Sequence, residues 1–446
     1  GTLEIVGSGN GIYAINTDVT INFAENVTFY VHDSIMTDGP LSGNGISLNG
    51  NFDGSVNAGE GVVLKLMNNK AVIYTYGSDP GTQNGPIGFI TINFDGCKLI
   101  DLSNNNGKGN GSGFHQGDGC YVDAVLNFEN CEEIRINDNK TDAICFNNGS
   151  NVSNLNIINC PNVEMKANGS WGTNAGFANI VNTTLNISDN GIDPWDKVTT
   201  TGSNFYCDEL TASNSTIIAD NANANCGIWV AGPAIIENCD ISAQNNAVVR
   251  IQKGGTLGVY DARSDSYDPA RYRANYPYAS GNGCYFGGET TILNTKINAS
   301  NNMGAGIVFR NNLNEENVSR INTSTIIADK NGFGNLRTGG GAVGEHDYIY
   351  KAGISVIAGQ VDVVDTYLSV VGNEKYDISY YYDEAFKDVS SKVTFDGNSV
   401  AKSAVQSENG TEIFSDAENK DTYVLSGSLQ GIRNNMTGTY GDTWNT

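Results

Sequence analysis

Proline and charged residues are both scarce in this chain of 446 residues: there are 8 prolines, and Asp, Glu, Lys and Arg together make up 17%. An intrinsically disordered chain would also have few β-branched and aromatic residues. Here Ile, Val, Phe and Tyr recur along the whole chain. The composition therefore excludes a largely disordered protein.

Positive charge is in short supply, with 25 Lys and Arg residues against 49 Asp and Glu residues and a net charge of −24. Nucleic acids and anionic membrane surfaces would repel such a chain, so we predict neither as a partner. No apolar run approaches the roughly 18–20 residues of a transmembrane helix, which predicts no membrane insertion of this segment. The chain begins GTLEIVGSGN, with neither an initiator Met nor a signal peptide, so we expect a processed piece of a longer protein.

No CxxC pair occurs among the 9 cysteines, and an odd number of cysteines cannot all form disulfides. This pattern argues against a zinc site or a redox site. Most of the cysteines fall inside two recurring phrases, so we expect buried thiols in an apolar stack, with disulfides as the alternative. We predict no metal site and no cofactor, with calcium as the one open alternative.

Glycine is abundant, with 54 residues, and asparagine is conspicuous throughout. Both residues tolerate a positive φ angle, so their abundance predicts many tight turns. No stretch of useful length has helical periodicity. These features together predict an all-β chain with frequent corners.

One short phrase recurs: an apolar pair, then Asn, then Cys, Thr or Ser, then an apolar residue, as in IIENCDI at 235–241 and ILNTKI at 292–297. The small residue of the phrase is Cys97, Cys131, Cys160, Thr183, Ser215, Cys239, Thr295, Ser324 or Thr366. The residue before it is Asn130, Asn159, Asn182, Asn214, Asn238 or Asn294, with Gly96, Thr323 and Asp365 as variants. The shortest interval, 23 residues from Cys160 to Thr183, is about one structural repeat, and longer intervals indicate added loops.

A second phrase follows the first: a Gly-rich turn and a short strand, as in AICFNN at 143–148, GIWV at 227–230 and GIVFRN at 306–311. Polar turns such as SAQNN and NASNN separate the two phrases. A short strand with one apolar side cannot bury that side alone, whereas stacked coils can, at roughly 1.5–3 kcal/mol for each Ile or Val. We expect the Asn of the first phrase to point inward and to bond the Asn of the next coil.

These Asn-Cys corners, Asn steps and uneven loops resemble the right-handed parallel β-helix of the pectate-lyase-like superfamily, over about residues 90–400. The resemblance implies an all-β fold, a right-handed parallel β-helix (solenoid) with loop insertions. Its expected parts are an N-terminal cap and first coils at 1–90, the parallel β-helix at 91–388 with an insertion at 254–283, and C-terminal coils or a cap at 389–446. The alternative, an array of β-sandwiches, would need hairpin turns every 8–12 residues or so, and these are not evident.

The insertion at 254–283 is the first candidate binding site, because loops on a rigid scaffold often carry function. Tyrosine faces can pack on sugar rings, and arginine can clamp carboxylates or sulfates. The alternative is a loop that packs its own tyrosines on the coil. The candidate residues are Tyr260, Tyr267, Arg271, Tyr272, Arg273 and Tyr276.

The second candidate site consists of Arg250, Arg310 and Arg337, which end the similar stretches AVVR, GIVFR and GNLR. Coiling would stack them in steps of about 4.8 Å and form a strip for an anionic glycan. The alternative is that each arginine pairs with a nearby acid, such as Glu315 or Asp329.

The resemblance to the lyases extends to the fold but not to their catalytic motifs. DPARYR at 268–273 is not the RxPxxR arrangement of the lyases, and RIQK at 250–253 is a partial match to the hydrolase motif, whose Gly-His-Gly is missing. We therefore predict no catalytic residues, and we expect the three histidines to lie in loops or on the surface.

The fold alone does not decide between functions, because it serves lyases, hydrolases, tailspikes and adhesins. We expect an extracellular module of a bacterial surface protein, on the cell surface or secreted, similar to adhesin-like β-helix proteins. Its partner would be a glycan or another host or environmental surface molecule. The alternatives are a polysaccharide lyase or glycoside hydrolase of the same fold, and a passive structural spacer.

Overall fold

The structure is a computed structural model. It describes residues 1–7, 9–15, 17–34, 43–49, 53–76, 88–105, 114–116, 122–146, 153–192, 202–223, 225–246, 259–261, 266–268, 281–310, 318–332, 352–357, 359–374, 376–381, 391–401, 422–430 and 443–445. The chain divides into two compact units, which we describe separately. Unit 1 comprises Gly1–Asp208, Asn214–Ile217 and Ile251–Asn275, and unit 2 comprises Glu209–Ser213, Ile218–Arg250 and Tyr276–Thr446.

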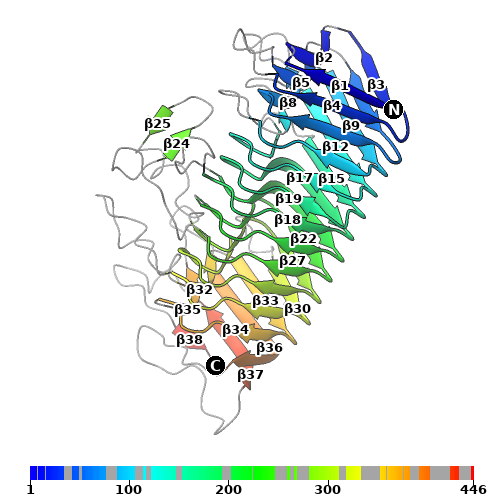
Figure 1. Ribbon diagram of the computed structural model, residues 1–446. Coiled ribbons are helices and arrows are strands. Elements are labelled where there is room, and N and C mark those ends of the chain that lie inside the picture. The colour runs from blue at the N-terminus through cyan, green and yellow to red at the C-terminus, as the bar shows by residue number, and fades with distance from the viewer. Residues whose placement is uncertain are drawn as a thin grey trace. The chain divides into compact units, whose positions relative to one another are not determined.

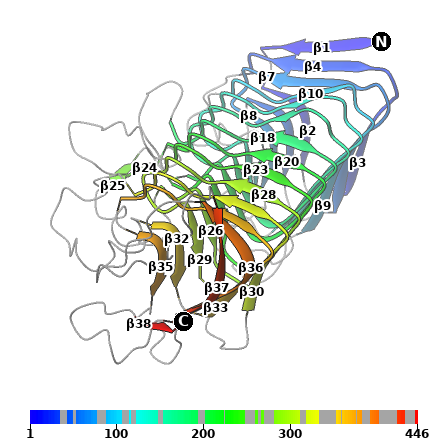
Figure 2. The ribbon, with the colours of Figure 1, turned by 90° about the horizontal axis from the view of Figure 1, so that it is seen from below.

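The strands of unit 1 pair in parallel into three ladders, each joining about every third strand of the chain. The first ladder contains β1 (Thr2–Val6), β4 (Thr28–His32), β7 (Val63–Met67), β10 (Leu99–Asp101), β13 (Ile134–Arg135), β16 (Val163–Glu164) and β18 (Thr184–Asn186). The second contains β2 (Asn10–Ile15), β5 (Asn44–Asn49), β8 (Ala71–Tyr76), β11 (Phe114–Gln116), β14 (Ile144–Cys145) and the start of β17 (Thr173–Val181). The third contains β3 (Val19–Phe23), β6 (Gly54–Ala58), β9 (Gly88–Asp95), β12 (Val122–Glu129), β15 (Ser153–Ile158) and the end of β17. Figure 2 shows β7, β8 and β9, one from each ladder, on different sides of this unit.

Unit 2 repeats the same three ladders. The first contains β23 (Asp240–Ser242), β28 (Lys296–Asn298), β31 (Thr325–Ile327) and β34 (Tyr367–Ser369). The second contains β21 (Ile228–Val230), β26 (Cys284–Phe286), β29 (Ile307–Phe309), β32 (Ala352–Ile357) and β35 (Tyr376–Tyr381). The third contains the end of β19 (Phe205–Ser213), β22 (Ala234–Glu237), β27 (Thr290–Leu293), β30 (Val318–Asn322), β33 (Gly359–Val364) and β36 (Ser391–Ala401).

The remaining strands lie outside these parallel runs. β37 (Thr422–Gln430) pairs antiparallel with β36, and β38 (Thr443–Asn445) pairs antiparallel with β37. β24 (Val259–Asp261) and β25 (Ser266–Asp268) form an antiparallel pair, and β19 and β20 (Thr216–Ile218) have residues in both units. The parallel ladders confirm the prediction of an all-β parallel β-helix, while the predicted boundaries at residues 90 and 388 stay predictions. No helix in the described ranges is long and apolar enough to cross a membrane.

The recurring Asn is explained by the backbone conformation at the corner before each first-ladder strand. At all nine predicted corners, the residue that precedes the small side chain has a positive φ, between 46° and 70°. L-residues rarely adopt this conformation, and Asn and Gly adopt it at the lowest cost. The Cys, Thr or Ser that follows is buried at each corner, as predicted.

The predicted bonds between the corner asparagines exist, since Nδ2 of Asn159 donates to Asn130 Oδ1 at 3.1 Å and Nδ2 of Asn294 donates to Asn238 Oδ1 at 2.8 Å. The predicted inward direction of these side chains is wrong, and a second, buried ladder is built by other asparagines. The Asn of the recurring phrase is exposed, because its positive φ places the next residue, and not the Asn, on the inside. The buried ladder comes from the polar turn before each second-ladder strand. In unit 1 this inner Asn ladder consists of Asn69, Asn105, Asn139, Asn168, Asn190 and Asn204, and in unit 2 of Asn246, Asn302, Asn331 and the half-buried Asn373.

Asn139 shows how the inner Asn ladder satisfies its polar atoms. Its Oδ1 accepts hydrogen bonds from the backbone N–H of Asn105 (3.1 Å) and from Asn105 Nδ2 (2.8 Å). Its Nδ2 donates to the Leu102 carbonyl (3.2 Å) and to Asn168 Oδ1 (3.0 Å). The fully buried amide of Asn139 is tolerated in the core because it finds partners in the coils before and after it.

The Gly-rich turn of the second phrase leaves room for this ladder. A Cβ atom built at Gly283 would lie 2.7 Å from Asn302 Nδ2 and 2.6 Å from the Gly306 carbonyl oxygen. Any other residue would therefore push the backbone away from the inner Asn ladder.

Like residues also stack in the apolar core of each unit. The rings of Phe94 and Phe128 stack at 5.4 Å in unit 1, and those of Phe286 and Phe309 stack at 5.6 Å in unit 2. The described cysteines are all buried thiols outside any disulfide, which confirms the prediction: Cys97, Cys131, Cys145, Cys160, Cys207, Cys226, Cys239 and Cys284.

Candidate functional site

The outward surface of the third ladder in unit 1 carries an ordered column of amides. Burial alternates along these strands, so one set of side chains faces the core and the other faces outward. Asn22, Asn57, Asn93, Asn127 and Asn156 occupy matching outward positions on β3, β6, β9, β12 and β15. Figure 1 shows β9, β12 and β15 in succession along this unit. We call this surface the asparagine face.

Hydrogen bonds between neighbouring strands fix the amides of the asparagine face. Nδ2 of Asn57 donates to Asn22 Oδ1 at 2.9 Å, and Nδ2 of Asn93 donates to Asn57 Oδ1 at 2.8 Å. The same bond joins Asn127 to Asn93 at 2.7 Å and Asn156 to Asn127 at 2.8 Å. An Asn amide has two N–H donors and two acceptor lone pairs, so a member of this column can offer a further donor and acceptor to a ligand.

A second outward column lies beside the amides. Thr20, Ser55, Thr91 and Val125 are in register on β3, β6, β9 and β12. They are followed in register by Asn154 on β15 and Phe177 on β17. All of these side chains are uncharged, and all are exposed or half-buried. The column therefore extends the neutral surface.

Phe89 gives the asparagine face an exposed aromatic ring. It is two residues before Thr91 on β9, so its side chain leaves the same side of the strand. Its exposed fraction is 40%, which is high for a phenylalanine. An exposed ring beside amides and hydroxyls suits a ligand that has both apolar and polar surfaces.

Acidic side chains border the asparagine face. Asp95 and Glu129 are in register two residues beyond the Asn column. At the other border, Asp18 Oδ1 accepts a hydrogen bond from the backbone N–H of Asp53 (3.1 Å), and Asp53 Oδ1 accepts one from the N–H of Phe89 (2.9 Å). These carboxylates repel anionic ligands, whereas uncharged ligands are not repelled.

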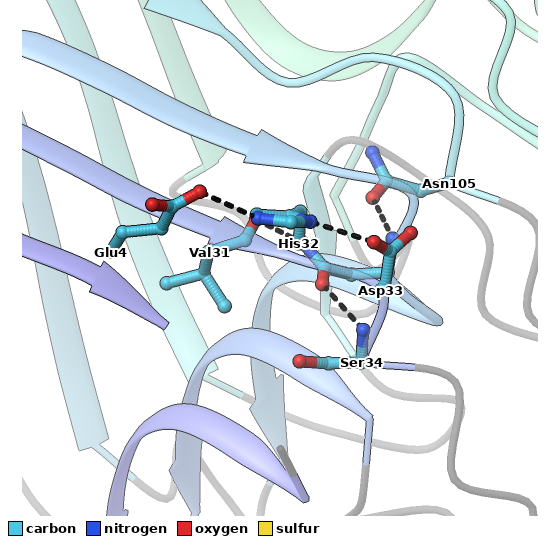
Figure 3. Close-up of polar contacts among 7 residues, drawn as sticks. Glu4, Val31, His32, Asp33, Ser34 and Asn105 are labelled. Carbon is cyan, nitrogen blue, oxygen red and sulfur yellow. Dashed lines mark hydrogen bonds and ion pairs between the residues drawn. The ribbon is translucent and has the colours of Figure 1, made fainter. Parts of the chain in front are cut away.

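A separate group of polar side chains surrounds His32 on the first ladder of unit 1. Figure 3 shows its ring between Glu4 and Asp33, with Nε2 3.0 Å from Glu4 Oε1 and Nδ1 2.7 Å from Asp33 Oδ2. The ring stacks on Tyr30 at 4.2 Å. The hydrogen bond with Asp33 raises the pKa of His32, with partial burial opposing the shift and Glu4 adding to it. In the described ranges, no three His, Cys, Asp or Glu side chains are arranged to hold a metal ion.

Asp101 is an acid that the sequence argument missed. It ends β10 in register with Lys65 on β7 and Arg135 on β13, and it follows the core residue Ile100. Its exposed fraction is only 6%, and its Oδ1 is buried without a hydrogen-bond partner. Burial raises the pKa of its carboxyl, while Ser103, Arg135 and Lys65 oppose that shift.

The structure describes only part of the predicted sites. It brings Tyr260 and Tyr267 directly opposite each other in the β24–β25 pair. Arg310 is half-buried and follows β29, where its backbone N–H donates to the Phe286 carbonyl at 2.7 Å. Asp329, a suggested partner for the arginines, accepts hydrogen bonds from the Ser369 hydroxyl and the Val371 N–H. The other predicted site residues lie outside the described ranges, and their role stays a prediction: Arg250, Arg271, Tyr272, Arg273, Tyr276 and Arg337.

The asparagine face was also missed, although the sequence carries a signal for it. INF recurs at 21–23 and 92–94, and LNF at 126–128; Asn lies between two half-buried residues in the first triplet and between two core residues in the other two. Aligning these triplets by strand register would have shown the column. Comparison of the chain with protein-family models, with curated proteins and with solved structures finds no match.

Proposed function

We propose that this chain is an extracellular, adhesin-like β-helix module of a bacterial surface protein and that it binds a glycan. The observation that carries the proposal is the asparagine face, where a regular column of half-exposed amides lies beside the exposed ring of Phe89. Glycans present hydroxyl and amide groups around rings with apolar C–H faces. A surface that combines ordered polar groups with an aromatic ring suits such a ligand.

The rigidity of the scaffold supports the same proposal. The amides are held by bonds of 2.7–2.9 Å between adjacent strands, so little side-chain freedom remains to be lost on binding. A preorganised surface binds more tightly than a flexible one with the same contacts. The resemblance of the corners to those of surface and tailspike β-helices supports the extracellular location.

The test is binding of the full chain to an array of glycans, followed by calorimetry with the best ligand. The expected result is saturable binding to at least one glycan class, without cleavage of that glycan. The absence of binding to every glycan would contradict the proposal. Cleavage of a polysaccharide would instead support the lyase or hydrolase alternative.

A further inference from the structure

The amide column sets the direction in which a ligand would lie. Its members occur once per strand, and adjacent strands are about 4.8 Å apart. A sugar unit of an extended β-linked chain has a length close to that spacing. A glycan that crosses the strands along the column would therefore meet about one amide with each sugar unit, from Asn22 to Asn156.

The chemistry of the column favours an amide-bearing sugar. Asn127 donates one N–H to Asn93 and accepts one N–H from Asn156, so a second N–H and a second lone pair stay available. An acetamido group carries one N–H and one carbonyl oxygen. It can bond to the column by the same amide-to-amide hydrogen bonds that already join the asparagines, at the same repeat.

The side chains around the amide column restrict further the class of sugar that it can bind. The borders carry Asp53, Asp95 and Glu129, which disfavour uronic acids and sulfated sugars. Phe89 offers a ring on which the apolar face of a sugar can stack. We propose that the asparagine face of unit 1 binds an uncharged glycan chain of N-acetylated sugars that runs across β3, β6, β9, β12 and β15. This inference rests on the proposed glycan-binding function and names the site and the sugar class.

The experiment measures affinity by calorimetry with three probes: a chito-oligosaccharide, a cello-oligosaccharide of equal length, and polygalacturonate. The full chain should bind the chito-oligosaccharide at least about tenfold more tightly than the cello-oligosaccharide, which lacks acetamido groups. It should not bind polygalacturonate.

Two variants locate the site. Asn93→Ala combined with Asn127→Ala should weaken binding of the chito-oligosaccharide by about tenfold or more, because two amides of the column are lost. Phe89→Ala removes the aromatic ring and leaves every amide in place. It therefore tests the site independently if the double variant fails to fold. Asn322→Ala is the matched control, because Asn322 is an exposed Asn on the third ladder of unit 2. The unfolding midpoint of each variant checks its fold.

The outcomes separate the two proposals. Equal binding of the chito-oligosaccharide by the wild type, the double variant and the Phe89 variant would refute this site and leave the general glycan function standing. Preference for the cello-oligosaccharide or for polygalacturonate would refute the sugar class. Failure to bind any glycan of the array would refute both.

Discussion

Replacing Asn139 by Ala tests whether the inner Asn ladder holds the coils of unit 1 together. Asn139 is fully buried and bonds to Asn105 in the preceding coil and to Asn168 in the following one. Ala removes these bonds, all of which lie inside the core. The backbone N–H of Asn105 and one of its Nδ2 hydrogens lose their acceptor, and Asn168 Oδ1 loses one of two donors.

The magnitude follows from the groups left without partners. A buried polar group without a partner costs about 1–3 kcal/mol. Two donors lose their acceptor, but Asn105 Nδ2 keeps contacts with the carbonyls of Leu102 and Ser103, at 3.2 Å each. We therefore expect a loss of about 3 kcal/mol in the free energy of unfolding. For a unit of this size that corresponds to a fall of roughly 6 °C in the midpoint of unfolding.

Asn127→Ala is the matched control, because Asn127 belongs to the same coil and also bonds to an Asn on each side. It is half-exposed, so water can replace the lost partners, and the expected cost is about 1 kcal/mol or less. Urea unfolding followed by near-ultraviolet circular dichroism measures both variants. Equal midpoints for the two variants would mean that buried and exposed amide ladders contribute alike, and the reasoning would fail.

Three further predictions concern ionisable groups. Asp33→Asn should lower the pKa of His32 towards its ordinary value of 6.5 in an NMR titration. Because the folded-state pKa of His32 is raised, its protonated ring should stabilise the fold below about pH 6.5, and that contribution should disappear as the pH rises through the folded-state pKa. Asp101→Asn should increase stability at pH 7 by about 1 kcal/mol, because it removes a buried charge with an unpartnered oxygen. That gain should shrink as the pH falls and Asp101 becomes protonated, and a constant gain would contradict the raised pKa. Burial raises the pKa of Cys226 and Cys284, so a thiol reagent at pH 8 should label neither cysteine until the chain is unfolded, as mass spectrometry of the peptides would show.

The corners could be predicted from the sequence because their chemistry is local. Positive φ at one residue favours Asn or Gly, and the tight inner position after it favours Cys, Ser or Thr, so the phrase is visible without knowledge of the fold. The direction of the Asn side chain was predicted wrongly. It depends on the φ of that one residue, and composition does not reveal this angle.

The asparagine face could not be found in the same way, because its members are aligned by strand register and not by a constant interval. Asn57 follows Asn22 by 35 residues, whereas Asn156 follows Asn127 by 29. Loops of different length between the ladders cause the difference. The buried state of Asp101 was equally hidden, because it depends on Lys65 and Arg135, which are neighbours only after coiling.

From Cys97 onward, successive coils of unit 1 offer the same pair of groups to their neighbours: an Asn amide in the core and a small thiol or hydroxyl at the corner. A coil can therefore act as a template for another copy of itself, because a duplicated segment would meet the partners it already has. Gene segments that encode one coil could be gained or lost without a new core having to arise. Under the proposed glycan-binding function, a surface built from one side chain per coil would then lengthen or shorten one sugar unit at a time.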